Sequence, residues 1–430
     1  MKRWTALVAF LLVTLFLYAC AEDTSSSAPT TLPTETETVL QTQPTEDPIL
    51  TARRDAAEQY MRNMANYMWR ASEDITYTRD ASVVTEEDLK GYSETKKIRI
   101  KAGRLYRGIP YSYAGCPAVN FMDYASEPDE KGIRTVSGLN WKSLNGNAET
   151  GRVGNDCSGA IALAWNSVGA DIMPSSTSKM VRNRGYLPVG QYQSDPDKNT
   201  LTKDTCLQNG GDVMFAAYAQ LKKADAIVYR KDTYGHTQMI VSVEVVYKDD
   251  GKIDPNASTV TTIDQTSSYI MDEVCAYDPE FGENVYRTFG IDKSYTFLDL
   301  FHEGYLPVTC KAFIDPSPVD EAYVFDTQPE HTLDTIFTGS FLSNRILSCV
   351  TVTITDEAGS QVGAVTCYNS RQSGVNVFSF DLAQIPQEPE YLLHGSLDLS
   401  ALAPGSYRCT HVLRDAHGVT YTVRDFEFTV

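Results

Sequence analysis

From about Val319 to Val430, the sequence consists of short segments in which apolar and polar residues alternate, with no helical stretch between them. One pair of segments reads RILSCVTVTITDEAGSQVGAVTCYNS, and turns rich in Gly, Pro and Asp separate the segments. Because the side chains of a strand point alternately to its two faces, such segments must bury one face against a second layer. The pattern therefore predicts an all-β sandwich over residues 317–430.

The predicted sandwich has the size of an immunoglobulin-like domain. Its segment LSALAPGSYRCTHVLRD resembles the last strand pair of many bacterial immunoglobulin-like modules. The linker IDPSPVDE comes before the sandwich and marks its boundary with the preceding domain.

Residues 93–316 combine helical and strand-like segments. The segment AIALAWNSVGA predicts a helix, and four later segments predict strands: DAIVYR, TQMIVSVEVVY, STVTTIDQT and VTCKAFI. A helix followed by strands with hairpin connections is the order of an α+β domain with an antiparallel sheet. The expected fold class is therefore α+β, followed by an all-β domain.

The first residues have the pattern of a targeting segment. Lys2 and Arg3 precede the apolar run TALVAFLLVTLFLYA, which is too short to span a bilayer comfortably. Ala19 then comes directly before Cys20, which resembles a bacterial lipobox, where the signal is cleaved before a cysteine that becomes lipidated. We therefore expect a signal peptide over residues 1–20, lipidation of Cys20, and an extracytoplasmic protein held at the bacterial cell membrane by its lipid anchor only. A plain signal peptide or an uncleaved anchor is the alternative.

Two segments precede the α+β domain. Residues 21–50 are dominated by Ser, Thr, Pro and Glu, which predicts a disordered linker because almost nothing in them can be buried. Residues 51–92 are expected to be a helical segment, and apolar residues at helical spacing within 49–75 predict an amphipathic helix that packs on the next domain. These apolar residues are Ala57, Tyr60, Met61, Met64, Tyr67 and Met68.

Composition excludes some classes of function. The formal net charge of −19 leaves no basic excess to displace counterions from phosphates, so no nucleic-acid partner is expected. The nine cysteines contain no CxxC pair, so a thiolate zinc site is not expected, and we predict neither a metal nor another cofactor. Disulfides are allowed outside the cytoplasm, but the sequence does not assign their pairing.

Cys157 lies in GNDCSG, immediately before the predicted helix AIALAWNSVG. The unpaired backbone N–H groups at a helix start stabilise a thiolate, and Asp156 and Ser158 are residue types that cap helices well. Taken alone, the motif is more typical of a core or disulfide-bonded cysteine. His236 changes this interpretation, because a histidine at the start of the strand-like segment TQMIVSVEVV can act as the base for such a cysteine.

Three stretches in order, GIPYSYAG, NDCSG and ADAIVY…GHTQMIVSV, resemble the NlpC-type peptidoglycan peptidases, a family of papain-like cysteine peptidases. The resemblance covers about 107–268, and it implies a papain-like domain in which the cysteine-bearing helix packs on an antiparallel sheet. It implies that Cys157 is the nucleophile, that His236 is the general base, and that Tyr111 is the tyrosine beside the active site. Asp156 and Ser158 match positions that line the pocket for the stem peptide in some members. Without the resemblance, Tyr111 is more typical of a core aromatic.

The third catalytic residue stays open between two neighbours. The family usually places a His, Asn or Gln on the strand after the one that begins with the histidine. The hydrophobic pattern of TTIDQTSS aligns Asp264 with that position, and Gln265 follows it. Because strand side chains alternate between faces, only one of the two can face His236, and a slip of one residue exchanges them. Asp264 is favoured.

The sequence departs from the family pattern in two respects. Ala224 occupies the place of the usual glycine in the turn before the histidine hairpin. Two long segments flank the predicted catalytic helix: the stretch between Gly115 and Gly154, with its Gly- and Asn-rich part 137–154, and the segment 183–211. We expect them to shape or cover a substrate groove because long loops around a site are often functional.

The Cys157–His236 pair, the targeting segment and the resemblance together predict a cell-wall cysteine endopeptidase that hydrolyses amide bonds in peptidoglycan stem peptides. The resemblance implies that the bond is the one between D-γ-glutamate and a diamino acid. Asp156 is additionally expected to pair with a free amino terminus of a trimmed stem peptide, unless it only caps the helix. Two alternatives remain. One is an amidase or acyltransferase with the same Cys–His pair, and the other is a non-enzymatic surface lipoprotein with a vestigial peptidase-like domain and a partner-binding sandwich.

Overall fold

A computed structural model of the chain describes residues 46–78, 97–112, 118–137, 154–169, 176–182, 185–194, 201–328, 330–368, 377–381 and 393–430. The predicted signal peptide, Cys20 and most of the predicted linker lie outside the described residues. Among the residues that the structure describes, no helix is long and apolar enough to cross a membrane. The seven cysteines within this part of the chain are all free thiols.

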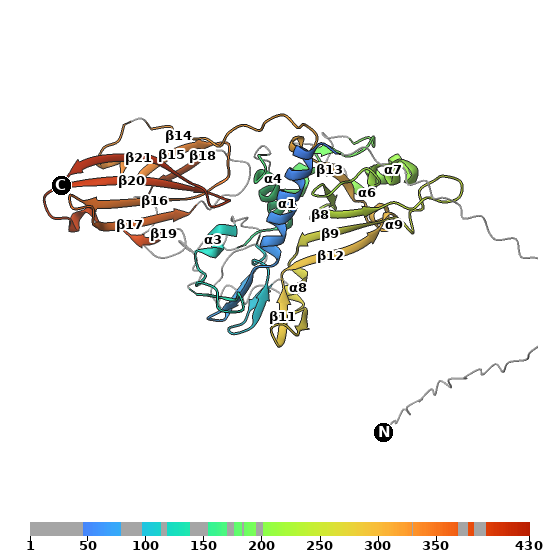
Figure 1. Cartoon of the computed structure of the whole chain (residues 1–430), viewed down its shortest axis with the longest axis horizontal. Helices are drawn as coiled ribbons and strands as arrows, with labels where there is room; N and C mark the ends of the chain where they lie inside the picture. The colour runs from blue at the N-terminus through green and yellow to red at the C-terminus, as the bar shows by residue number, and fades with distance from the viewer. Residues whose placement is uncertain are drawn as a thin grey trace, which may run out of the picture. The chain divides into compact units, whose positions relative to one another are not determined.

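A six-stranded sheet in the order β12-β9-β8-β7-β13-β6 forms the centre of the first domain, and each neighbouring pair is antiparallel (Figure 1). Its strands are β6 (Leu187–Pro188), β7 (Ala226–Arg230), β8 (Gly235–Glu244), β9 (Thr259–Gln265), β12 (Phe289–Thr296) and β13 (Leu306–Thr309). Helix α4 (Cys157–Asn166) packs against β8 and β9. All ten residues of α4 are buried, because apolar residues occupy nearly all of its faces.

Helix α1 (Pro48–Ala65) packs against α4 and buries Ala57, Met61 and Met64. The predicted helix over 49–75 is therefore too long. After Asn66 the chain becomes extended and forms β1 (Met68–Ala71), in which Trp69 and Ala71 are buried and their neighbours are not. Pairing with two other strands and burial of the large Trp69 side chain favour the strand over a continued helix.

A second sheet in the order β10-β11-β4-β1-β5 contains both parallel and antiparallel pairs, and β2 and β3 form a separate antiparallel pair. The strands are β2 (Ile75–Thr78), β3 (Lys97–Ile100), β4 (Leu105–Arg107), β5 (Arg134–Val136), β10 (Cys275–Asp278) and β11 (Glu283–Arg287). The remaining helices of this part are α3 (Ala118–Met122), α5 (Thr177–Met180), α6 (Thr202–Asn209), α7 (Gly211–Tyr218), α8 (Ser268–Met271), α9 (Phe297–Glu303) and the 3₁₀ turn η2 (Lys311–Phe313). The predicted strand VTCKAFI thus ends at Thr309 and continues as a turn.

The C-terminal residues form two antiparallel sheets, β14-β15-β18 and β19-β17-β16-β20-β21. Their elements are β14 (Val324–Asp326), η3 (Leu333–Thr335), β15 (Thr338–Ser343), β16 (Leu347–Asp356), β17 (Gln361–Tyr368), β18 (Val377–Asp381), β19 (Leu393–Ser396), η4 (Leu399–Ala401), β20 (Ser406–Asp415) and β21 (Thr420–Thr429). Both sheets contribute to one apolar core, with Phe341 and Phe380 from one sheet and Val350 and Leu413 from the other. The α+β class with antiparallel sheets is confirmed.

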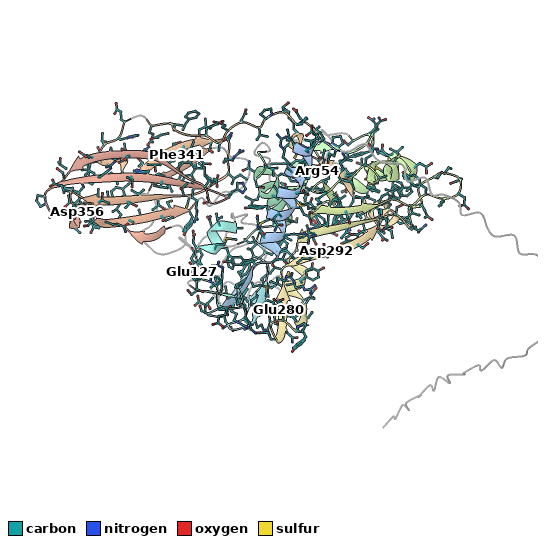
Figure 2. The ribbon with its side chains drawn as sticks, in the orientation of Figure 1. Arg54, Glu127, Glu280, Asp292, Phe341 and Asp356 are labelled. Atoms are coloured by element: carbon teal, nitrogen blue, oxygen red, sulfur yellow. The ribbon has the colours of Figure 1, made fainter. Side chains whose placement is uncertain are left out.

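A buried ion pair fastens α1 to the first domain. Arg54, labelled in Figure 2, is 4% exposed, and its Nη1 atom lies 2.8 Å from the Oδ1 atom of Asp225, which is also buried. The same guanidinium donates to the carbonyl oxygens of Lys223 and Phe313. The buried apolar residues of α1 belong to the same core as those of the sheet, so α1 and the sheet form one packed unit.

Candidate active site

Cys157 is the first residue of α4, and Asp156 is the residue that caps this helix. The Oδ1 atom of Asp156 accepts hydrogen bonds from the Gly159 N–H at 2.6 Å and from the Ser158 hydroxyl at 2.9 Å. Burial raises the pKa of Asp156, although these hydrogen bonds oppose the shift. The structure therefore places both flanking residues in the cap of the helix that carries the cysteine.

The segment before Cys157 pairs with the GIPYS stretch. Asn155 N–H donates to the Pro110 carbonyl at 3.2 Å, and Ser112 N–H donates to the Asn155 carbonyl at 3.0 Å. Gly154 has a φ of 127°, and a Cβ atom there would overlap with the Pro110 carbonyl oxygen. A glycine is needed at this position because any larger residue would separate the two segments.

Tyr111 lies in this paired segment and forms an isolated parallel bridge with Asn155, which is two residues before Cys157 in the chain. Its side chain is buried and belongs to the apolar core of the first domain, and its carbonyl accepts a hydrogen bond from the Tyr77 hydroxyl at 2.8 Å. The structure therefore places the Tyr111 side chain in the apolar core, and its backbone pairs with the segment that precedes Cys157.

His236 is the second residue of β8, and its ring lies between the side chains of Cys157 and Asp264. Its Nε2 atom lies 2.6 Å from the Oδ2 atom of Asp264, and its ring also hydrogen-bonds the Cys157 side chain. The His236 side chain is 19% exposed, whereas Asp264 is fully buried. The structure therefore brings together three predicted residues that come from α4, β8 and β9.

Gln265 points to the other face of β9, as strand alternation requires. Its Nε2 atom donates to the carbonyl oxygens of Ile109 and Pro110, at 3.1 and 2.8 Å. It therefore holds the GIPYS stretch in place, and of the two open candidates Asp264 is the one that contacts His236.

The charges of the cluster support one another. Burial disfavours a charged imidazole, but the Cys157 side chain and the Asp264 carboxylate outweigh it and raise the pKa of His236 to about 10. Burial also disfavours the Asp264 carboxylate, but His236 and Lys293 outweigh it and lower the pKa of Asp264. Both shifts in pKa favour the charged forms, an imidazolium at His236 and a carboxylate at Asp264, which suits a cysteine–imidazolium pair.

Three further side chains near the cluster were missed by the sequence reasoning. Lys293 of β12 places its Nζ atom 3.2 Å from the Oδ1 atom of Asp264. Tyr229 of β7 lies opposite His236 in the ladder, with ring centroids 6.2 Å apart, and Tyr234 of the same hairpin is 50% exposed. None of the three belongs to a recognisable motif. Strand pairing brings Lys293 and Tyr229 to the site, whereas Tyr234 is two residues before His236 in the chain.

The two departures from the family pattern have structural explanations. Ala224 has a φ of 66°, in the left-handed region that favours glycine, and it is held there by a hydrogen bond from its N–H to the Ile240 carbonyl and by one from Trp165 to its own carbonyl. The segment 183–211 contains β6 and α6, and it packs on the domain core through buried residues that include Tyr192 and Cys206. Most of 137–154 lies outside the described residues.

Comparisons with known proteins provide no relative: no protein-family model, no curated protein and no solved structure matches this chain. Among the described residues, no group of three or more His, Cys, Asp or Glu side chains is arranged to hold a metal ion. A helix-start cysteine, a hydrogen-bonded imidazole and a buried carboxylate are the groups that acyl transfer through a thioester requires.

Proposed function

We propose that this protein is a lipid-anchored, extracytoplasmic cysteine endopeptidase that hydrolyses amide bonds in peptidoglycan stem peptides. The observation that carries the proposal is the position of His236 between Cys157 and Asp264. The sequence resemblance includes the same residues, Cys157, His236 and Asp264. We further propose that the first domain is papain-like and that the C-terminal domain is immunoglobulin-like.

The proposed reaction begins with the Cys157 thiolate attacking the carbonyl carbon of the scissile amide. The helix-start N–H groups of α4 stabilise the resulting oxyanion, and the N–H of Cys157 is the first candidate because the Gly159 N–H already donates to Asp156. His236 protonates the departing amine, which leaves a thioester on Cys157. Water then attacks the thioester while neutral His236 accepts its proton. The acid product leaves, and the thiolate–imidazolium pair of Cys157 and His236 is restored.

Asp264 has a separate role in this scheme. It accepts a hydrogen bond from the imidazolium and fixes the ring plane, so that the other ring nitrogen faces the cysteine. Because Asp264 is fully buried, its charge acts on His236 with little screening by solvent.

The substrate class follows from the resemblance, and the proposed bond is the one between D-γ-glutamate and the diamino acid. Asp156 lies next to the nucleophile and is the proposed partner of a free amino terminus on a trimmed stem peptide. Tyr229 and Tyr234 offer an aromatic wall beside His236 that suits the extended part of such a peptide.

The test is the cleavage of purified muropeptides by the protein, with the products identified by mass spectrometry. We expect cleavage by the native protein and none by Cys157→Ala. The matched control is Cys275→Ala, which removes an exposed thiol outside the cluster and should leave cleavage unchanged. Cleavage that survives Cys157→Ala would refute the assigned nucleophile.

Two alternatives give different results in the same assay. An amidase or acyltransferase with the same Cys–His pair would form an acyl-enzyme on Cys157 but act on another amide or pass the acyl group to an added amine. A non-enzymatic lipoprotein with a vestigial domain would form no acyl-enzyme with any of these substrates. Trapping of the acyl-enzyme by mass spectrometry of the intact protein therefore separates the three functions.

A further inference from the structure

An irregularity in β12 determines which residue faces Asp264. Gly290 pairs with Asp264 and Lys293 pairs with Thr262, so β12 uses three steps where β9 uses two. The extra residue makes this stretch of β12 a β-bulge. Asp292 lies within the bulge, and its φ of 52° is in the left-handed region. In an uninterrupted ladder, residue 292 would pair with Thr262 and would place an aspartate on the face of Asp264. The bulge replaces that like charge with a lysine.

The bulge is held in place from outside the sheet. Asp292, labelled in Figure 2, forms an ion pair with Arg62 of α1, with the Nη2 and Oδ1 atoms 3.0 Å apart. Arg62 also pairs with Glu58 on the same helix. The side chain that would repel Asp264 is thus directed to α1 and is 55% exposed.

Gly290 leaves the space that this arrangement needs. A Cβ atom at this position would overlap with the Oδ1 atom of Asp264 and with the Cε atom of Lys293. The carboxylate and the lysine side chain therefore meet over the backbone of Gly290, and any side chain there would displace one of them.

Each oxygen of Asp264 consequently has a cationic neighbour. Oδ2 lies 2.6 Å from His236, and Oδ1 lies 3.2 Å from the Nζ atom of Lys293, which is also 3.5 Å from Oδ2. Oδ1 is buried and accepts no hydrogen bond in the described part of the chain, because the hydrogen bond from Lys293 goes to Oδ2. An ionised carboxylate with one oxygen buried and unpaired is strongly destabilised, so the lysine offsets a cost that His236 alone does not cover.

We propose that Lys293 is a positioning residue of the active site, which keeps Asp264 ionised and oriented so that Asp264 can hold His236 against Cys157. The inference rests on the proposed function only for its effect on catalysis, because the charge arrangement itself is independent of the substrate. With Lys293 the cluster alternates in charge along Cys157, His236, Asp264 and Lys293, and its formal charges sum to zero when the thiolate is formed.

The charged and titratable groups that face this cluster come from several elements. His236 is faced by Cys157 and Asp156 at the start of α4 and by Asp264 on β9. Lys293 is faced by Asp264, by Tyr269 of α8, whose ring centroid is 5.0 Å from Nζ, and by Tyr295 on its own strand. Lys293 is the cationic side chain among these groups that contacts Asp264 without belonging to the Cys–His pair.

The test compares Lys293→Met, which removes the charge and keeps most of the side-chain volume, with Lys293→Arg, which keeps the charge. Two quantities are measured on the full chain: kcat and KM for a muropeptide, and the pH profile of Cys157 alkylation by iodoacetamide. We expect Lys293→Met to lower kcat on the order of 100-fold with little change in KM, because a misplaced imidazole reduces the rate by about that factor. Lys293→Arg should restore most of kcat.

The alkylation profile requires no substrate, so it tests the inference even if no muropeptide is cleaved. Loss of the cation weakens the ion pair, and the rise in alkylation rate should therefore move to higher pH in Lys293→Met and stay in place in Lys293→Arg. The matched control is Lys311→Met, which removes a lysine that is 75% exposed, lies in the turn η2 and pairs with Asp315, and it should change neither quantity.

Gly290→Ala is the second variant, and we expect it to produce the same upward shift of the alkylation profile because it displaces Asp264 or Lys293. An unchanged kcat together with an unchanged profile in Lys293→Met would overturn the inference. A change in KM alone would also overturn it, because that result indicates a lysine that binds substrate. If Lys293→Met does not fold, as judged by circular dichroism, an unshifted profile in Gly290→Ala would contradict the inference.

Discussion

The Nε2 atom of His236 lies 2.6 Å from the Oδ2 atom of Asp264, across the neighbouring strands β8 and β9. This contact joins the residue at the start of one strand to the buried carboxylate near the end of the next. It fixes the imidazole ring relative to the sheet, whereas the cysteine is fixed relative to α4. The packing of α4 on β8 and β9 therefore determines whether the Cys–His pair forms.

The two neighbours on β9 should separate catalysis from stability. Asp264→Asn should lower kcat by roughly 10⁴-fold, the effect of the same change in a hydrolase triad, because the amide does not stabilise the imidazolium. Gln265→Ala should instead lower the free energy of unfolding by about 1–3 kcal/mol, since it removes the donor to two buried carbonyl oxygens. Steady-state kinetics and denaturant unfolding of both variants check the assignment, which fails if Gln265→Ala is the variant with the larger loss of kcat.

The pH profile of kcat/KM should fall on the alkaline side near pH 10. The pKa of His236 is raised to about 10, so the imidazolium persists below that pH and loses its proton as the pH rises through it. Without that proton His236 cannot protonate the departing amine. The residual activity of Asp264→Asn should show this limb at a lower pH, because the carboxylate that raises the pKa is gone. An alkaline limb at the same pH in both proteins would contradict this role of Asp264.

Asp156 can be tested for its two proposed roles with a pair of variants. Asp156→Ala should lower the free energy of unfolding by about 1 kcal/mol through loss of the helix cap, whereas Asp156→Ser should retain most of the cap. If Asp156 also binds a substrate amine, both variants should raise KM for a stem peptide with a free amino terminus and not for its N-acetylated form. A KM that responds only to Asp156→Ala would assign Asp156 to the cap alone.

The buried pair that fastens α1 should contribute strongly to stability. Arg54→Met leaves the Asp225 carboxylate buried without its cation, and breaking such a pair costs about 3–5 kcal/mol of unfolding free energy. Lys223→Met is the control, because its ion pair with Asp55 is exposed and contributes no more than about 1 kcal/mol. Equal losses in the two variants, measured by chemical denaturation, would show that burial of the Arg54 pair is not the cause.

Much of the site could be predicted because it rests on local patterns. The start of a helix at Cys157 follows from a capping residue before an apolar run, and the strand that begins near His236 follows from its β-branched and apolar residues. The predicted helix over 49–75 failed at Ala65, where helical spacing alone could not show that Trp69 pairs into a sheet. Propensity decides an element only until tertiary packing offers a larger gain.

The sequence by itself determined the residue types that make a Cys–His pair possible, the caps and periods that place them at element starts, and the α+β order of the chain. The tertiary structure decided which of two neighbouring side chains faces the imidazole of His236, because the register between β8 and β9 sets whether Asp264 or Gln265 points to it. It also decided that Lys293 joins the cluster, since a single extra residue in β12 exchanges an aspartate for a lysine. Strand register and bulges depend on pairing between segments that are distant in sequence, and no local pattern encodes them.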